Sequence, residues 1–464
     1  MNRIIRNPGS YKDPAGSIYK YNGRILRSVK SQGVKRYEFI KKNKILDLSI
    51  ENNFLIKTKE INKLKIEPEF SDAHYVLEHE PIPYVSYPYE WGFYQLQSAA
   101  LHHLNFQIFL LEKNSVLIDA SAYNIQFIGS KPIFIDVLSI DKYEEGDFWK
   151  GHSQFLEHFL NPLLLRSKKD IIFNNWYKGN IDGISTSDLN SLLGITDKFS
   201  INIFLQVVML SKLNKKTITN PKKSINKLKD KKTFSKKSYL GILIQLRNWI
   251  EKLRPKNKNT VWENYENDNS YSKDAKNAKL EIIRKFSSKM KPQILADLGC
   301  NDGLFTFESL NNGSNYAVGF DFDINAIDLA FNNSKKINNN FLPLYFDVTN
   351  PSTNLGFNEK ERESFNKRIN FDAMIGLAFI HHLTIAKNIP LADAVSWLMN
   401  IAPIGLIEFI PKKDPTIQQM IYLKGDIFPE YNEENFLNLI KKNGKIISIN
   451  SMKDSGRKII EFQK

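Results

Sequence analysis

The stretch Asp297-Leu298-Gly299-Cys300-Asn301-Asp302-Gly303 decides the fold of the second half of the chain. It follows the short apolar run 293–297, which is typical of a buried strand, and precedes 305–310, which can form a helix. The two glycines let the backbone turn sharply and approach a ligand closely, and the start of the helix offers free amides with a partial positive charge. This order predicts a ligand site at the carboxyl end of a strand in an open α/β sheet.

Strands and helices continue to alternate on both sides of this loop, which predicts a parallel α/β sheet. Asp321 ends the second predicted strand, where an acid can accept hydrogen bonds from both hydroxyls of a ribose. Asp347 ends the third strand and is placed to meet an adenine edge. The expected strands are 293–297, 316–321, 341–346, 371–375 and a closing pair at 445–449 and 458–462, and the expected helices include 275–285, 305–310 and 325–334.

The loop resembles the first motif of the class I S-adenosylmethionine-dependent methyltransferases, an acid–x–Gly–x–x–x–Gly sequence. Asp297, Gly299 and Gly303 match it, while Asn301 stands where many members carry glycine. The resemblance implies a Rossmann-like, seven-stranded methyltransferase domain with S-adenosyl-L-methionine as its cofactor. It also implies a set of cofactor-binding residues that extends to Ala378, in the segment that lines the methyl-transfer side in that family: Asp297, Gly299, Asn301, Gly303, Asp321, Asp347 and Ala378.

Two adjacent histidines, His381 and His382, follow the predicted fourth strand and are the candidate catalytic residues. A histidine there can take the proton from a substrate hydroxyl as the methyl group is transferred. Alternatively, one ring caps the strand and the other packs under the next helix, and the sequence does not choose between the two as the base. Adjacent histidines without acidic or cysteine partners are a weak metal motif, so no metal site is predicted here.

Two further residues have competing interpretations. Cys300, the only cysteine, is interpreted as a small packing residue of the loop rather than a nucleophile. Glu408, in the expected fifth strand, either orients the substrate or forms an ion pair with Lys412, and the ion pair is favoured.

The positive charge is concentrated in one segment of the chain. The 464 residues carry a formal net charge of +15, yet 211–258 contain 16 lysines and arginines and two acids, which leaves 49 basic and 48 acidic residues elsewhere. We therefore predict a first domain over 1–210, a basic linker over 211–259 and the methyltransferase domain over 260–464. The alternative is a landing surface for RNA, lipid headgroups or an anionic glycan.

The first domain is expected to have an α+β fold. Two β-prone runs, 17–21 and 24–29, are joined by Asn22-Gly23, which predicts a type I′ hairpin. Apolar residues at helical spacing predict a buried helix over 95–113. The runs 124–128 and 132–136 predict a second hairpin.

Asp119, Asn124 and Asp136 form a second constellation in this domain. It resembles the catalytic and metal-binding loops of protein kinases and aminoglycoside phosphotransferases, in which such residues orient the acceptor and hold magnesium. The resemblance implies a kinase-like fold that binds Mg-ATP. Leu117-Ile118 before the first Asp and Val137-Leu138 after Asp136 depart from the pattern, and no clear glycine-rich loop is present. A degenerate, substrate-recognising domain is therefore favoured over an active kinase, and plain turn residues are the third interpretation.

The two halves together resemble a bacterial two-domain group related to a rhizobial nodulation host-specificity protein, through 87–91, 119–124, 134–136 and 154–160. This resemblance implies a methyltransferase acting on a surface glycan or lipo-oligosaccharide. We expect methyl transfer to a hydroxyl of a saccharide or small metabolite. The alternatives are a bifunctional kinase–methyltransferase, an RNA methyltransferase and a non-catalytic adaptor that binds the cofactor.

The expected location is the cytoplasm. The chain has a single cysteine and opens without a basic-then-apolar leader, so secretion is not expected. It also lacks an apolar run long enough to span a bilayer. Nucleic acid is disfavoured as the substrate because the excess charge lies in one segment, and the sequence does not define the oligomeric state.

Overall fold

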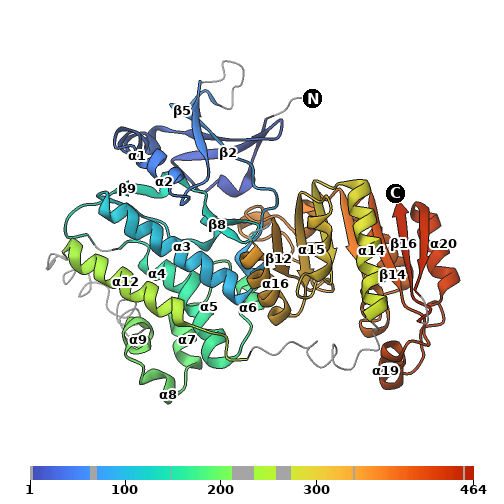
Figure 1. Ribbon diagram of the computed structural model, residues 1–464. Coiled ribbons are helices and arrows are strands. Elements are labelled where there is room, and N and C mark those ends of the chain that lie inside the picture. Colours follow the sequence, from blue (N-terminus) through green and yellow to red (C-terminus); the bar gives the residue numbers. More distant parts are fainter. Residues whose placement is uncertain are drawn as a thin grey trace. The chain divides into compact units, whose positions relative to one another are not determined.

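The computed structural model describes residues 4–62, 70–147, 149–211, 235–257, 273–337, 340–452 and 455–464. The chain divides into two compact units (Figure 1). The first consists of Met1–Phe127, Pro132–Lys258 and Asn354–Glu363, and the second of Ile128–Lys131, Asn259–Thr353 and Ser364–Lys464. Much of the predicted basic linker, 212–234 and 258–259, lies outside the described residues.

A described part of the predicted linker is a helix of the first unit. α12 (Lys236–Lys252) packs against α3 (Phe93–Glu112). The side chain of Gln97 donates a hydrogen bond to the carbonyl oxygen of Ile250 at 2.7 Å, and that of Gln107 donates to the Tyr239 hydroxyl at 2.7 Å. The linker prediction is therefore wrong for 236–252, because apolar side chains at helical spacing are buried among the lysines: Tyr239, Leu243, Leu246 and Ile250.

The first unit contains a five-stranded antiparallel sheet in the order β1-β2-β3-β5-β4. The predicted hairpin is confirmed: Asn22 and Gly23 turn with φ of +49° and +75°, as a type I′ turn requires. The strands are β1 (Ile5–Arg6), β2 (Gly16–Tyr21), β3 (Arg24–Val29), β4 (Thr58–Ile61) and β5 (Tyr75–His79).

Helices and two short strand pairs complete the first unit. α3 is the predicted buried helix, since Leu96, Leu104 and Leu111 are fully buried on it. The second predicted hairpin is β7 (Ile125–Ile128) with β8 (Lys131–Phe134). The other elements are β6 (Ser115–Leu117) paired with β9 (Ile140–Lys142), and the helices α1 (Ser31–Lys42), α2 (Ile45–Glu51), α4 (His152–Phe155), α5 (Asn161–Leu164), α6 (Asn174–Gly179), α7 (Thr186–Leu192), α8 (Ile195–Lys198) and α9 (Ile201–Ile203).

The second unit is built on a seven-stranded sheet in the order β12-β11-β10-β13-β14-β16-β15. The first five strands in this order are parallel, and β16 runs antiparallel to both β14 and β15. The predicted Rossmann-like α/β fold is therefore confirmed. The strands are β10 (Ile294–Leu298), β11 (Tyr316–Asp321), β12 (Phe341–Tyr345), β13 (Ala373–Gly376), β14 (Ile404–Phe409), β15 (Lys445–Ser451) and β16 (Lys458–Gln463).

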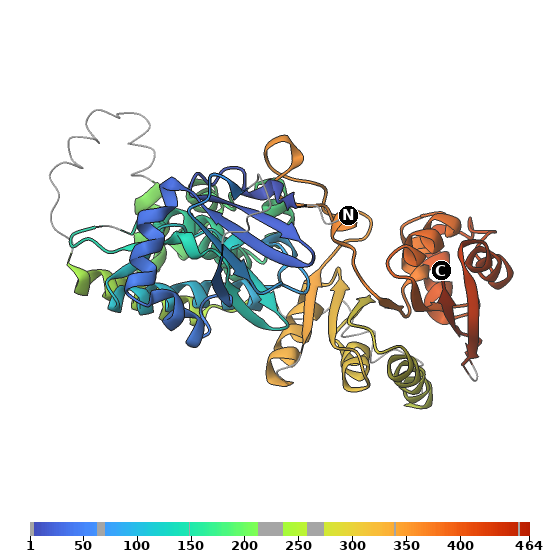
Figure 2. The same ribbon diagram turned by 90° about the horizontal axis from the view of Figure 1, so that it is seen from above.

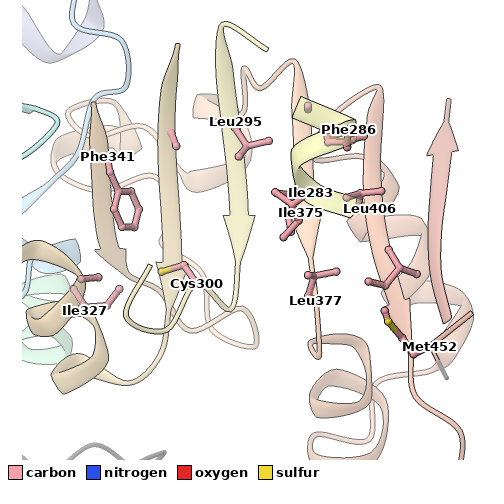
Figure 3. Close-up of a cluster of buried hydrophobic side chains, with 14 residues drawn as sticks. Ile283, Phe286, Leu295, Cys300, Ile327, Phe341, Ile375, Leu377, Leu406 and Met452 are labelled. Carbon is pink, nitrogen blue, oxygen red and sulfur yellow. The ribbon is translucent and has the colours of Figure 1, made fainter. Parts of the chain in front are cut away.

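Helices cover the sheet because its five parallel strands are buried on both faces. Figure 2 shows α14, α15 and α16, coloured from olive to amber, along one side of the strands. Their side chains join those of the strands in one core cluster, which includes Ile283, Phe286, Leu295, Ile327 and Phe341 (Figure 3). The helices are α14 (Lys273–Met290), α15 (Leu304–Asn311), α16 (Ile324–Ile337), α17 (Phe365–Arg368), α18 (Leu391–Met399), α19 (Pro415–Lys424) and α20 (Glu433–Asn443). No helix among the described residues is apolar and long enough to cross a membrane.

Candidate active site

The residues predicted to bind the cofactor lie where parallel strands end. β10 ends at Leu298, directly before the glycine-containing loop, and β11 ends at Asp321. Asp321 lies in register with Tyr345, the last residue of β12, and Asp347 follows two residues later. Parallel strands place their carboxyl ends at one edge, so the fold brings the loop, Asp321 and Asp347 together there.

Three residues of the loop after β10 have a left-handed backbone conformation. Gly299, Asn301 and Gly303 have φ of +78°, +47° and +93°. The backbone amides of Gly299 and Cys300 donate hydrogen bonds to the carbonyl oxygen of Phe320, at 2.8 and 3.2 Å, which fastens the loop to β11. Asparagine adopts the left-handed region more readily than most residues, so Asn301 can replace the glycine that many methyltransferases carry.

Both glycines are also sites of close approach. A Cβ atom on Gly303 would lie 2.5 Å from the ring of Phe341, and one on Gly299 would lie 3.1 Å from the ring of Phe379. Gly303 is the N-cap residue of α15 and has no side chain with which to cap the helix. Leu304 N, the first amide of α15, donates to Asp302 Oδ1 at 3.3 Å, so the predicted binding of a ligand carboxylate at the start of α15 would use the amides that follow.

Asp321 is buried and fixed by two backbone amides. Its carboxylate accepts hydrogen bonds from Asn301 N and from Asp323 N, each at 2.9 Å. Burial raises the pKa of Asp321 to about 6 in spite of these hydrogen bonds. Carboxylate oxygens accept more than one hydrogen bond each, so this side chain can still bind the hydroxyls of a ribose.

Asp297 lies in β10, next to its carboxyl end. The residue is 2% exposed, and its carboxylate accepts a hydrogen bond from Thr306 Oγ1 of α15 at 2.5 Å. Burial raises its pKa to about 7. Asp297 thus joins the end of β10 to the helix that follows, and its role in cofactor binding stays a prediction.

Asp347, predicted to bind the cofactor, and Cys300, predicted to be a packing residue, also lie at this edge. Asp347 accepts hydrogen bonds from the backbone amide and the hydroxyl of Thr349, at 2.9 and 2.7 Å, so its carboxylate is held beyond β12. Cys300 is 4% exposed within the core cluster, and burial raises the pKa of its thiol. These features agree with packing rather than with nucleophilic chemistry.

Ala378 lies in the segment after β13, in a left-handed conformation with φ of +49°. Its backbone amide donates a hydrogen bond to Glu408 Oε2 at 2.8 Å, and Lys279 Nζ lies 2.7 Å from the same oxygen. The favoured ion pair of Glu408 with Lys412 is therefore wrong: Lys412 pairs instead with Asp426 at 2.7 Å. The two residues do not pair because their side chains lie in different places. The Glu408 side chain is buried in the core, whereas Lys412 lies beyond the end of β14 and is partly exposed.

The two candidate catalytic histidines differ in burial. Their ring centroids are 4.2 Å apart, and His381 is fully buried while His382 is partly exposed. Neither ring nitrogen of His381 has a hydrogen-bond partner among the described residues. Burial lowers the pKa of both imidazoles, that of His382 to about 4, so both are neutral near pH 7.

Asp119, Asn124 and Asp136 come close together in the first unit. Burial raises the pKa of Asp119, a hydrogen bond from Ser121 N at 2.8 Å opposes the shift, and the charge of Asp136 raises the pKa further. However, Arg27 Nη1 lies 2.6 Å from Asp136, and Arg27 Nη2 lies 2.6 Å from Asp13. A guanidinium therefore neutralises the carboxylate for which magnesium was predicted. Within the described ranges, no group of three or more His, Cys, Asp and Glu side chains could hold a metal. The kinase-like interpretation and its Mg-ATP stay predictions.

The sequence reasoning missed three residues that shape this site: Lys279, Thr306 and Phe379. Lys279 had a detectable signal, because it precedes Ile283 and Phe286 by four and seven residues and so lies on the apolar face of α14. A lysine on a buried face requires a counter-charge. The contacts of Thr306 and Phe379 have no comparable signal in the sequence.

Similar proteins are found among solved structures and among known sequences. No family model matches the sequence. Among solved structures, the magnesium protoporphyrin IX methyltransferase ChlM from Synechocystis PCC 6803 is 17% identical, with 44% of this chain and 92% of that chain covered and a TM-score of 0.30. The N-methyltransferase NodS from Bradyrhizobium japonicum WM9 is 10% identical, with 42% and 98% covered and a TM-score of 0.31. TM-scores this low do not support a fold assignment, so the assignment rests on the strand order of the sheet.

The sequence comparison is far stronger. Nodulation protein NoeA of Rhizobium meliloti (strain 1021) is 38% identical over 460 residues, which cover 99% of this chain and 96% of that protein. The predicted relation to rhizobial nodulation proteins is therefore confirmed, and the chain belongs to the family of nodulation protein NoeA.

Proposed function

We propose that this protein is an S-adenosylmethionine-dependent methyltransferase, whose cofactor site is the carboxyl edge of β10, β11 and β12. The observation that carries the proposal is the left-handed loop from Gly299 to Gly303, joined to the buried Asp321 through Asn301 N. It combines a close backbone approach, an acid placed for ribose hydroxyls and a helix start placed for a carboxylate. These are the groups by which a nucleoside carrying an amino acid would be recognised.

The residues of the chain mainly bind and orient the reactants. S-adenosylmethionine, when bound, supplies a methyl group on an electrophilic sulfonium. Asp321 would accept hydrogen bonds from the ribose, and the start of α15 would hold the carboxylate. Because the methyl donor is already activated, most of the remaining rate enhancement comes from alignment with the acceptor.

We assign the role of general base to His382 rather than His381. His382 is the partly exposed residue of the pair, whereas His381 is fully buried. A base must reach the proton it removes, and a neutral imidazole can accept that proton from a hydroxyl. Burial lowers the pKa of His382 to about 4, so its imidazole is neutral near pH 7 but is a weaker base than a free imidazole, and proton removal would accompany methyl transfer rather than precede it.

The rate of methyl transfer in histidine variants tests whether His382 is the general base. We expect His382→Ala to lower the rate of transfer by about 10²- to 10⁴-fold, as is typical for loss of a general base, with cofactor affinity changed by less than about twofold. His381→Ala is the matched control and should instead lower thermal stability, because it leaves a cavity in the core. Radiolabelled methyl incorporation into cell extracts provides the measurement. Equal rates for wild type and His382→Ala would exclude His382 as the base.

Cofactor affinity should depend on pH through Asp321. Its pKa of about 6 lies above the ordinary value, so the carboxyl group is protonated below pH 6 and ionised above it. Ribose hydroxyls donate to the ionised form, so we expect S-adenosylmethionine to bind more tightly as pH rises from 5 to 7. Calorimetry at several pH values measures this. Asp321→Asn should bind weakly and lose the rise centred near pH 6, and an unaltered pH profile in that variant would contradict the assignment.

The acceptor that we propose is a hydroxyl of a saccharide or small metabolite. The support for this choice is the resemblance to the rhizobial nodulation group, which implies a surface glycan or lipo-oligosaccharide as the acceptor, and this chain belongs to the family of nodulation protein NoeA. Fractionation of extracts after radiolabelling would identify the acceptor class: label in RNA, removed by ribonuclease, would overturn this choice.

A further inference from the structure

A buried network of charges lies behind the segment that follows β13. Lys279 of α14 and Glu408 of β14 are 2% and 0% exposed, and their charged atoms lie 2.7 Å apart. The second oxygen of Glu408 lies 3.9 Å from Arg457 Nη1, and Arg457 Nε donates to Asp414 at 2.7 Å. Burial lowers the pKa of Lys279, and the charge of Glu408 opposes that shift. Because apolar residues often replace a buried ion pair without loss of stability, its presence here invites a further role.

Glu408 makes a second contact that points to such a role. The oxygen that faces Lys279 also accepts the hydrogen bond from Ala378 N, at the residue with φ of +49°. This conformation is costly for alanine and persists only where its surroundings impose it. The next residue is Phe379, whose ring lies 3.1 Å from the place of a Cβ on Gly299. The turn at Ala378 therefore fixes the wall against which the cofactor loop packs.

We propose that Glu408, held by Lys279, is a positioning residue for the cofactor site. Its carboxylate imposes the left-handed turn at Ala378 and so places Phe379 against Gly299. Lys279 is needed because it fixes the direction of the carboxylate and compensates its charge. This inference rests on the proposed function, since the site that it shapes is the proposed S-adenosylmethionine site.

A rescue experiment distinguishes a positioning role of Glu408 from a role in stability alone. Lys279→Met with Glu408→Leu replaces the ion pair by apolar side chains, which keeps the core filled and removes the acceptor for Ala378 N. We expect this pair variant to bind S-adenosylmethionine about tenfold more weakly, because the strained turn is no longer imposed. Adding Ala378→Gly should restore the affinity to within about threefold, because glycine adopts the left-handed turn without cost. Amide exchange of the peptide 377–381 should be faster in the pair variant than in wild type.

A second ion pair in the same unit provides the control for the pair variant. Lys412→Met with Asp426→Leu removes an exposed ion pair near the end of β14 and should leave the affinity unchanged. A pair variant that binds as wild type does, or a loss that Ala378→Gly fails to restore, overturns the positioning role alone. Failure of the wild-type protein to bind S-adenosylmethionine overturns the proposed function and this inference with it. If the pair variant does not fold, Glu408→Asp replaces it in the comparison with and without Ala378→Gly. This variant keeps the charge but shortens the reach of the carboxylate to Ala378 N.

Discussion

Gly299→Arg is expected to abolish measurable binding of S-adenosylmethionine. A Cβ atom at this position lies 3.1 Å from Phe379, φ is +78°, and the longer side chain must extend across the loop that approaches the ligand. We expect the affinity to fall about 100-fold or more, which corresponds to about 2.7 kcal/mol or more of lost binding energy. Isothermal calorimetry on the full chain measures it.

Gly425 provides the matched control for this substitution. It lies in the same unit with a nearly equal φ of +79°, yet no atom lies within 4 Å of its Cβ position. Gly425→Arg therefore also places an arginine at positive φ and adds the same charge without crowding the loop, and it should bind the cofactor as wild type does. Binding by Gly299→Arg within about threefold of wild type would show that the loop is not the cofactor site.

The second large effect concerns stability. Lys279→Met should leave the Glu408 carboxylate buried with only the more distant Arg457 nearby. Breaking a buried ion pair on one side typically costs about 3–5 kcal/mol, and Arg457 places the expected loss near the lower limit, about 3 kcal/mol. For a unit of this size, the melting temperature should fall by about 6–12 °C, which thermal unfolding followed by circular dichroism can measure.

Two comparisons define the cause of that loss. Lys412→Met breaks an exposed pair and should cost at most about 1 kcal/mol. Lys279→Met combined with Glu408→Leu removes both charges and should regain most of the lost stability, because no uncompensated charge then stays in the core. A double variant as unstable as Lys279→Met would mean that lost packing of the lysine stem, and not the orphaned carboxylate, causes the destabilisation.

The α/β architecture could be predicted because its signals are local. Each short apolar strand, each helix between the strands and the loop with Gly299 and Gly303 has its signal in residues that are close together in the sequence. The Asn22-Gly23 turn is a further example, since these residue types adopt positive φ angles at little cost. The basic segment was misjudged as a linker over 236–252 because its charge masked an apolar helical face that becomes visible only when packed against α3.

The sequence by itself thus determined the residue types at the candidate site and the strand ends that carry them. Only the tertiary structure decided what each charged group does. Glu408 meets Lys279 and Ala378 rather than Lys412, and Asp136 meets Arg27, a residue more than a hundred positions earlier in the chain. The physical reason is that these interactions join residues far apart in the chain, and their strength and pKa values depend on burial, which is a property of the folded core.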